Sequence, residues 1–62
     1  MIELTGVPIG ARLRVTGGLT AEVLERIDDE WVRVRIIAAA GSAVVGEEEL
    51  CHATDVQEVL PA

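Results

Sequence analysis

Apolar and polar side chains alternate most strictly in the segment 31–38, WVRVRIIA. One side of an extended backbone here carries β-branched residues: Val32, Val34 and Ile36. The other side carries the tryptophan and two arginines: Trp31, Arg33 and Arg35. A period of two is typical of a half-buried strand, and β-branched side chains pack well on a pleated surface. We therefore predict a strand whose valine and isoleucine side chains enter the core, with Trp31 partly buried on the opposite face.

The segment 11–16, ARLRVT, has the same period and predicts a second strand. Its apolar side consists of Leu13 and Val15, and its polar side of Arg12, Arg14 and Thr16. The pair Gly17–Gly18 follows, and paired glycines supply the positive φ angles that a tight hairpin turn requires. The strand is therefore expected to turn back directly into the next segment.

That next segment, LTAEVLERI at 19–27, alternates less regularly because Leu24 and Glu25 are out of phase. A break of this kind predicts a local twist or a bulge. A helical stripe through Thr20, Val23, Leu24 and Ile27 also fits the residues. The run is short for a helix, however, since a glycine pair precedes it and the acidic segment 28–30 follows it. We therefore predict a strand.

The two ends of the chain and the segment after residue 38 are less regular. MIELT at 1–5 predicts an opening strand, and AVV at 43–45 predicts a short one. The tail, 47–60, fits either one α-helix ended by Pro61 or a turn at 47–50 followed by a last strand at 55–60. Thr54 and Asp55 are poor residues for a helix interior, which favours the turn and strand.

Short strands separated by glycine-containing turns indicate an all-β fold, a small five-stranded barrel or meander with room for a short helical turn near residues 47–53. The 62 residues form a single domain, 1–62, because no linker or repeat divides them. A chain this short buries only about 60% of the surface that it exposes when unfolded, so its core is marginal. We therefore expect self-association or a protein partner to add stability.

Charge and hydropathy narrow the range of functions. Eleven acidic residues and five arginines give a net charge of −6, opposite in sign to the usual nucleic-acid footprint. No apolar run approaches the roughly 18 residues of a membrane span. The first residues lack the pattern of a secretory signal, and one free cysteine fits a reducing compartment, so we expect a cytoplasmic protein.

The residue types that carry catalysis are sparse and badly placed. Cys51 and His52 are neighbours, and neighbouring side chains diverge on a strand or a helix, so they do not predict a catalytic pair. One cysteine and one histidine are too few for a zinc site, and the consecutive glutamates at 47–49 are typical of a solvated charge run. We predict no catalytic residue, no metal site and no cofactor, and hence a protein that is not an enzyme.

The run of short strands followed by EEL at 48–50 and a last strand resembles the SH3-like small β-barrel fold from Gly10 onward. The resemblance implies a five-stranded barrel. It implies no particular activity, because folds of this kind carry many unrelated functions.

A second resemblance is to the carbon storage regulator family, small dimeric translational repressors that bind RNA. The matching stretches are MIELT at 1–5, IG at 9–10, LTAEVL at 19–24, VRV at 32–34 and EEL at 48–50. That family reads RNA with arginines after its first strand and beside its last strand. Here those positions hold Gly6 and Val7, and Gly46 and Glu47, so none of the RNA-binding residues is carried over.

The candidate binding residues are the lone tryptophan and the arginines of the two clearest strands: Trp31, Arg33, Arg35, Arg12 and Arg14. An exposed aromatic ring beside cations can stack a base or bind an acidic peptide. Alternatively, the ring covers the end of the core and the arginines pair with acids across the sheet. We predict a non-enzymatic interaction module or oligomer subunit, with RNA binding through an arginine face as the alternative.

Overall fold

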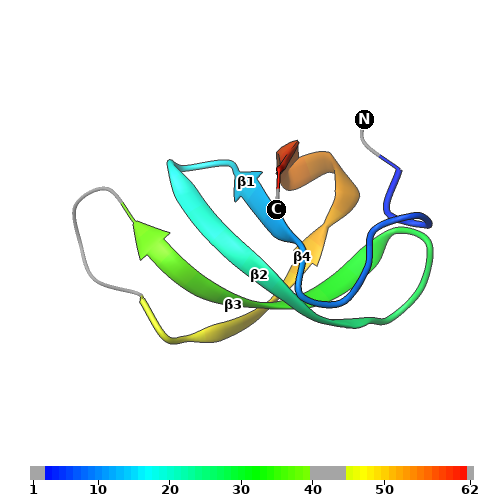
Figure 1. The fold of residues 1–62 in the computed structure, drawn as a ribbon, viewed down its shortest axis with the longest axis horizontal. Helices are drawn as coiled ribbons and strands as arrows, with labels where there is room; N and C mark the ends of the chain where they lie inside the picture. The colour runs from blue at the N-terminus through cyan, green and yellow to red at the C-terminus, as the bar shows by residue number, and fades with distance from the viewer. Residues whose placement is uncertain (1–2, 40–44, 62) are drawn as a thin grey trace.

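Five antiparallel strands form one sheet in the order β4-β3-β2-β1-β5, in a computed structural model that describes residues 3–39 and 45–61. The strands are β1 (Arg12–Val15), β2 (Leu19–Arg26), β3 (Trp31–Ala39), β4 (Glu48–His52) and β5 (Val56–Leu60). One 3-10 turn, η1 (Ala53–Asp55), connects β4 to β5. The first four strands form a meander, and β5 returns to pair with β1. The sheet is strongly curved (Figure 1) but does not close into a barrel, because β4 and β5 are its two ends.

The hairpin between β1 and β2 turns at the predicted glycine pair. Gly17 and Gly18 have φ angles of +92° and +77°, which side chains with a Cβ atom rarely adopt. Thr16, at the start of the turn, donates from its backbone N–H to the carbonyl oxygen of Asp55 over 2.9 Å. The tight turn thereby also fixes the position of η1.

The pairing between β2 and β3 contains the predicted irregularity. Val23 lies opposite Val34 and Glu25 lies opposite Arg33, so Leu24 is an extra residue in β2. A second shift lies between Thr20 and Ala21, where β3 carries the extra residue. Such bulges increase the local twist of a sheet. They allow these long strands to bend around the core.

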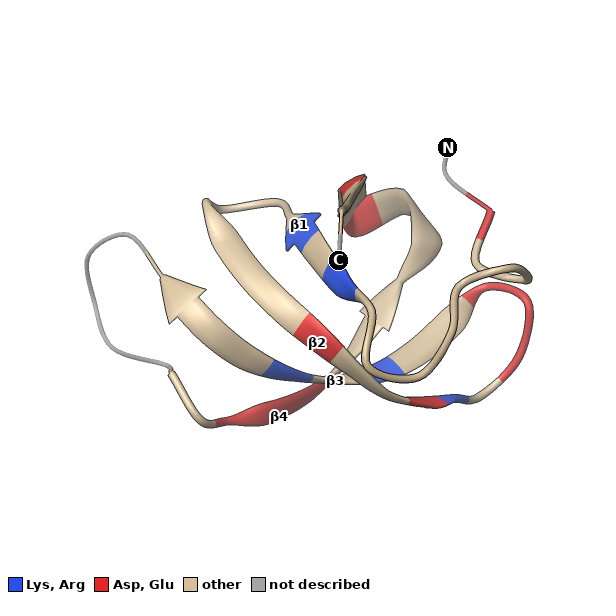
Figure 2. Ribbon diagram, viewed as in Figure 1, with Lys and Arg blue, Asp and Glu red and all other residues tan. Residues whose placement is uncertain are grey.

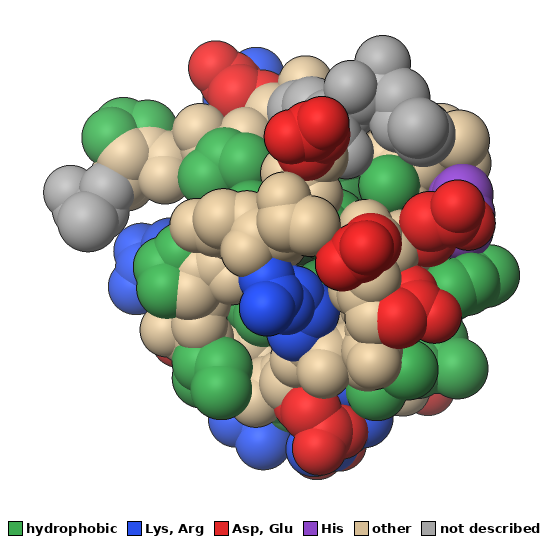
Figure 3. Space-filling model, turned by 90° about the vertical axis from the view of Figure 1, so that its right-hand side faces the viewer, with side chains coloured by type: hydrophobic (Ala, Val, Ile, Leu, Met, Phe, Trp, Pro, Cys, Tyr) green, Lys and Arg blue, Asp and Glu red, His purple; other side chains and the backbone are tan. Residues whose placement is uncertain are grey.

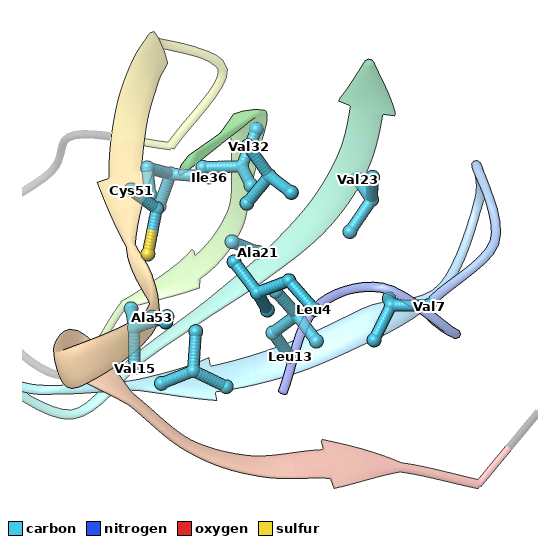
Figure 4. Close-up of a cluster of buried hydrophobic side chains, with 12 residues drawn as sticks. Leu4, Val7, Leu13, Val15, Ala21, Val23, Val32, Ile36, Cys51 and Ala53 are labelled. Carbon is cyan, nitrogen blue, oxygen red and sulfur yellow. The ribbon is translucent and has the colours of Figure 1, made fainter. Parts of the chain in front are cut away.

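The concave side of the sheet holds the core (Figure 4), and the β3 register is as predicted. Val32, Val34 and Ile36 are each 1% exposed or less. They pack with residues of the other strands and of the N-terminal segment, among them Leu4, Leu13, Val23 and Cys51. No polar side chain is buried within the described part of the chain. The core is therefore entirely apolar, as alternation on β1 and β3 requires.

The predicted opening strand at 1–5 is wrong for the residues that the structure describes; Met1 and Ile2 lie outside them. Leu4 is fully buried, but its segment belongs to no strand. The guanidinium of Arg26 donates to the carbonyl oxygens of Leu4 and Thr5, and the N–H of Val7 donates to that of Leu4. A side chain and a local turn, rather than a neighbouring strand, therefore satisfy this backbone.

The segment before β4 also differs from the prediction. Of the strand expected at 43–45, residues 43 and 44 lie outside the described part, and Val45 lies in a turn with Gly46, whose φ is +96°. A turn was expected at 47–50, but residues 48–50 form the start of β4. Pairing with β3 gives the backbone of Glu49, opposite Val34, hydrogen-bond partners that an isolated turn would lack.

The tail follows the strand alternative rather than the α-helix. Its last strand is Val56–Leu60, within the predicted segment 55–60. The helical turn lies at Ala53–Asp55, at the end of the region near residues 47–53 where one was expected. His52 begins it, since its Nδ1 atom accepts a hydrogen bond from the N–H of Thr54. Among residues 3–39 and 45–61, no helix has the length and apolar character needed to cross a membrane.

Candidate functional site

The predicted arginines of β1 and β3 lie beside carboxylates on the convex face of the sheet. Glu22 of β2 lies between Arg12 and Arg35 in the strand register, and Glu48 of β4 lies opposite Arg35 on its other side. The Nη2 atom of Arg35 is 3.4 Å from a carboxylate oxygen of Glu48. Figure 2 shows this alternation of basic and acidic residues across the sheet. The charges of Arg12, Glu22, Arg35 and Glu48, which lie side by side across the sheet, therefore cancel.

The other two candidate arginines, Arg33 and Arg14, form ion pairs with glutamates. Arg33 contacts Glu25, with 3.4 Å from Nε to the carboxylate, and donates a second hydrogen bond to Glu48. Arg14 lies 2.9 Å from the carboxylate of Glu58 on β5. Exposed pairs of this kind contribute about 0–1 kcal/mol each to stability. Their main consequence here is that the sheet does not present a continuous positive surface.

Trp31 begins β3 on the same convex face and contacts the only histidine of the chain. Its ring lies edge-on to that of His52, with the ring centroids 4.7 Å apart and the planes at 75°. The indole side chain remains 39% exposed. Its backbone N–H donates over 2.9 Å to a carboxylate oxygen of Asp28, which fixes the start of the strand. Trp31 therefore lies as predicted, partly covered and outside the core.

Two apolar residues that the sequence did not mark as candidates lie next to Trp31. Ile27 is 50% exposed, and its N–H donates to the carbonyl oxygen of Trp31 across the β2–β3 turn. Leu50 is 62% exposed and lies two residues before His52 on β4, hence on the same face. We call Ile27, Trp31, Leu50 and His52 the Trp31 cluster. The positions of Ile27 and Leu50 beside Trp31 follow from the bulge at Leu24 and from the pairing of β4 with β3, and no local pattern in the sequence shows that pairing.

Acidic residues border this cluster at the β2–β3 turn, whereas Arg33 lies opposite Leu50 in the β3–β4 ladder. The turn between β2 and β3 carries Asp28, Asp29 and Glu30, and a carboxylate oxygen of Glu30 lies 3.3 Å from Nε2 of His52. Figure 3 shows acidic side chains gathered around the histidine, with hydrophobic side chains beside them. An apolar patch with an acidic border is suited to a partner that is itself apolar and basic.

A cleft of about 310 Å³ lies on the other, concave side of β4. Its apolar wall includes Val15, Leu19, Ile36 and Cys51, and its polar wall includes the acidic residues Glu49 and Asp55. Burial raises the pKa of the Cys51 thiol, and the charges of Asp55 and Glu49 raise it further. Both carboxylates therefore act electrostatically on the interior of the cleft.

Cys51 and His52 point to opposite faces of β4, as adjacent strand residues should. The thiol donates a weak hydrogen bond of 3.6 Å to the backbone oxygen of His52, not to its ring. Within the residues that the structure describes, no group of three or more histidine, cysteine or acidic side chains is placed to hold a metal ion.

Comparison of the chain with protein-family models, with curated proteins and with solved structures finds no match.

Proposed function

We propose that this protein is a non-enzymatic small β domain that binds another protein through the Trp31 cluster. The observation that carries the proposal is the exposure of three large apolar side chains, Ile27, Trp31 and Leu50, at one corner of the sheet. A chain with a marginal core would gain stability by burying them, yet they remain outside it. Tryptophan is also among the residues that most often dominate the binding energy of an interface.

We further propose that the fold is related to the SH3-like small barrels, with its sheet left open between β4 and β5. Four strands in a meander, a 3-10 turn and a last strand beside the first are consistent with that resemblance. Interaction modules are common among such folds, but the fold alone does not identify a partner. We further propose a cytoplasmic location, because the single cysteine is a buried free thiol.

RNA binding through an arginine face is the alternative prediction, and the charge arrangement gives it less support. Affinity for nucleic acid comes largely from neutralising phosphates with cationic side chains. In this protein, glutamate carboxylates already neutralise Arg14, Arg33 and Arg35. An RNA backbone would have to displace them on a protein whose net charge is −6.

Photo-crosslinking in a native lysate tests the proposal, with a photoreactive amino acid at position 50. We expect a discrete set of protein adducts that Trp31→Ala removes. Position 59 is the matched control, because Val59 is as exposed as Trp31 but lies on β5. Equal adducts from positions 50 and 59, or adducts that survive Trp31→Ala, would argue against the Trp31 cluster as the contact surface. Sedimentation equilibrium of the purified chain distinguishes self-association from binding to another protein.

A further inference from the structure

The free edge of β4 lies beside the concave cleft. β4 is an end strand, and no described strand pairs with its second edge. The N–H of Ala53 donates to Glu30, and the carbonyl oxygen of Glu47 accepts from Ile36, so the odd-numbered residues bond toward β3. Because hydrogen bonding alternates along an antiparallel strand, the backbone groups of Glu48, Leu50 and His52 point to the free edge. These groups can pair with an added strand.

An added strand would also reach the cleft. Glu49 and Cys51 belong to β4 and line the cleft with their own side chains. Side chains of a strand alternate between the two faces of a sheet. Every second side chain of a segment paired with β4 would therefore lie over the cleft, and the others would lie near Leu50 on the convex face.

The charges at the cleft identify the chemistry of the segment. Glu49 and Asp55 form no ion pair within the described part of the chain, whereas Glu25, Glu48 and Glu58 are paired with arginines. An arginine or lysine could lay its methylene groups against the apolar wall and place its charged end beside these carboxylates. A second copy of this chain would instead bring another β4 rich in glutamate.

We propose that the free edge of β4 and the cleft bind an extended basic segment of another protein by strand addition, with an arginine or lysine side chain in the cleft. This site adjoins the Trp31 cluster and shares Leu50 with it, because Leu50 also lines the cleft. Trp31→Ala distinguishes the two proposals, since it should remove binding to the Trp31 cluster and leave strand addition at β4 in place.

Capped synthetic octapeptides test the inference on the whole protein. The probe alternates arginine and valine; one control replaces arginine with glutamate, and another carries N-methyl groups on its central amides. The arginine peptide should bind and should slow alkylation of Cys51, the only cysteine, which lines the cleft. Both controls should bind at least about tenfold more weakly, because one reverses the charge and the other removes strand hydrogen bonds. Equal binding of either control would overturn the inference.

Matched charge variants locate the binding. Glu49→Gln should weaken the arginine peptide about threefold or more, whereas Asp29→Asn, which changes the net charge equally in the β2–β3 turn, should leave its affinity unchanged. Equal losses in the two variants would indicate attraction by the overall charge and would contradict a site at the cleft. Protection of Cys51 that grows with protein concentration and without peptide would assign the edge to a second copy. Trp31→Ala should retain peptide binding, which separates this result from the test of the Trp31 cluster.

Discussion

Trp31 and His52 lie opposite each other in the β3–β4 ladder, and their rings meet edge-to-face with centroids 4.7 Å apart. The same imidazole accepts the N–H of Thr54 at its Nδ1 atom over 3.1 Å. His52 therefore connects the exposed tryptophan of one face to the 3-10 turn that returns the chain to β1. The other ring nitrogen, Nε2, lies 3.3 Å from a carboxylate oxygen of Glu30 in the β2–β3 turn.

Replacing His52 should separate these two roles. His52→Ala removes both the ring contact and the acceptor, so we expect a loss of about 2 kcal/mol in the free energy of unfolding. Acrylamide should also quench Trp31 fluorescence more strongly. His52→Phe keeps a ring against Trp31 but lacks the acceptor, and should show near-native quenching with a loss of about 1 kcal/mol. If acrylamide quenches Trp31 fluorescence equally in both variants, the His52 ring does not cover the indole.

The core residues should be much less tolerant of truncation than the Trp31 cluster. Leu13 is fully buried, and Leu13→Ala should cost about 2–5 kcal/mol through lost burial and a cavity. Because a domain of this size has a total stability near the lower end of about 5–15 kcal/mol, the variant should lose a large part of it. Leu50→Ala removes the same atoms from a side chain that is 62% exposed, and should change stability by about 0.5 kcal/mol or less. Urea unfolding followed by circular dichroism measures the free energy of unfolding of both variants. A large loss of stability in Leu50→Ala but not in Leu13→Ala would contradict the burial of these two residues.

Alternation along β1 and β3 was sufficient to predict their core faces, because a one-residue shift would bury Arg14 or Arg33 without compensation. The same pattern could not assign Leu4. That residue is buried through a turn and a hydrogen bond from Arg26, an interaction with no local signature in the sequence. A side chain can fill the core without being part of a strand, so apolar periodicity overpredicts strands at chain ends.

The candidate site was predictable only in part. Trp31 and the arginines stood out by residue type, but pairing with glutamates depends on a register that no single segment contains. Leu50 becomes a neighbour of Trp31 only because β4 pairs with β3, and the cleft exists only because the sheet stays open beside β4. Each of these depends on contacts between segments far apart in the chain.

Two glycines provide a test of backbone conformation that is independent of packing. A Cβ atom added at Gly6 or at Gly17 would meet no heavy atom within 4 Å, but only Gly17 has a positive φ, of +92°. Gly17→Ala should therefore cost about 1 kcal/mol or more through backbone strain alone. Gly6→Ala should be neutral or slightly stabilising, because it restricts the unfolded chain. Thermal unfolding compares the two, and equal melting temperatures would contradict the turn geometry at Gly17.

The Cys51 thiol should make stability depend on alkaline pH. Burial, and then the charges of Asp55 and Glu49, raise its pKa in the folded protein above the ordinary thiol value of about 8.5. The folded state therefore holds this proton more tightly than the unfolded chain does. Its contribution to stability is complete below the unfolded pKa and is lost as the pH rises through the folded pKa.

Among the side chains, this loss is assigned to Cys51, because the sequence contains neither lysine nor tyrosine, the other side chains that titrate near this pH. Urea unfolding between pH 7 and about 10 should show a decrease in the free energy of unfolding that Cys51→Ala abolishes. The pH midpoint of Cys51 alkylation should lie above the ordinary value and should fall in Asp55→Asn, which removes one nearby charge. Glu22→Gln, with the same change in net charge on the convex face, should leave the midpoint in place. An unshifted midpoint in Asp55→Asn would remove Asp55 from the causes of the raised thiol pKa and leave burial and Glu49.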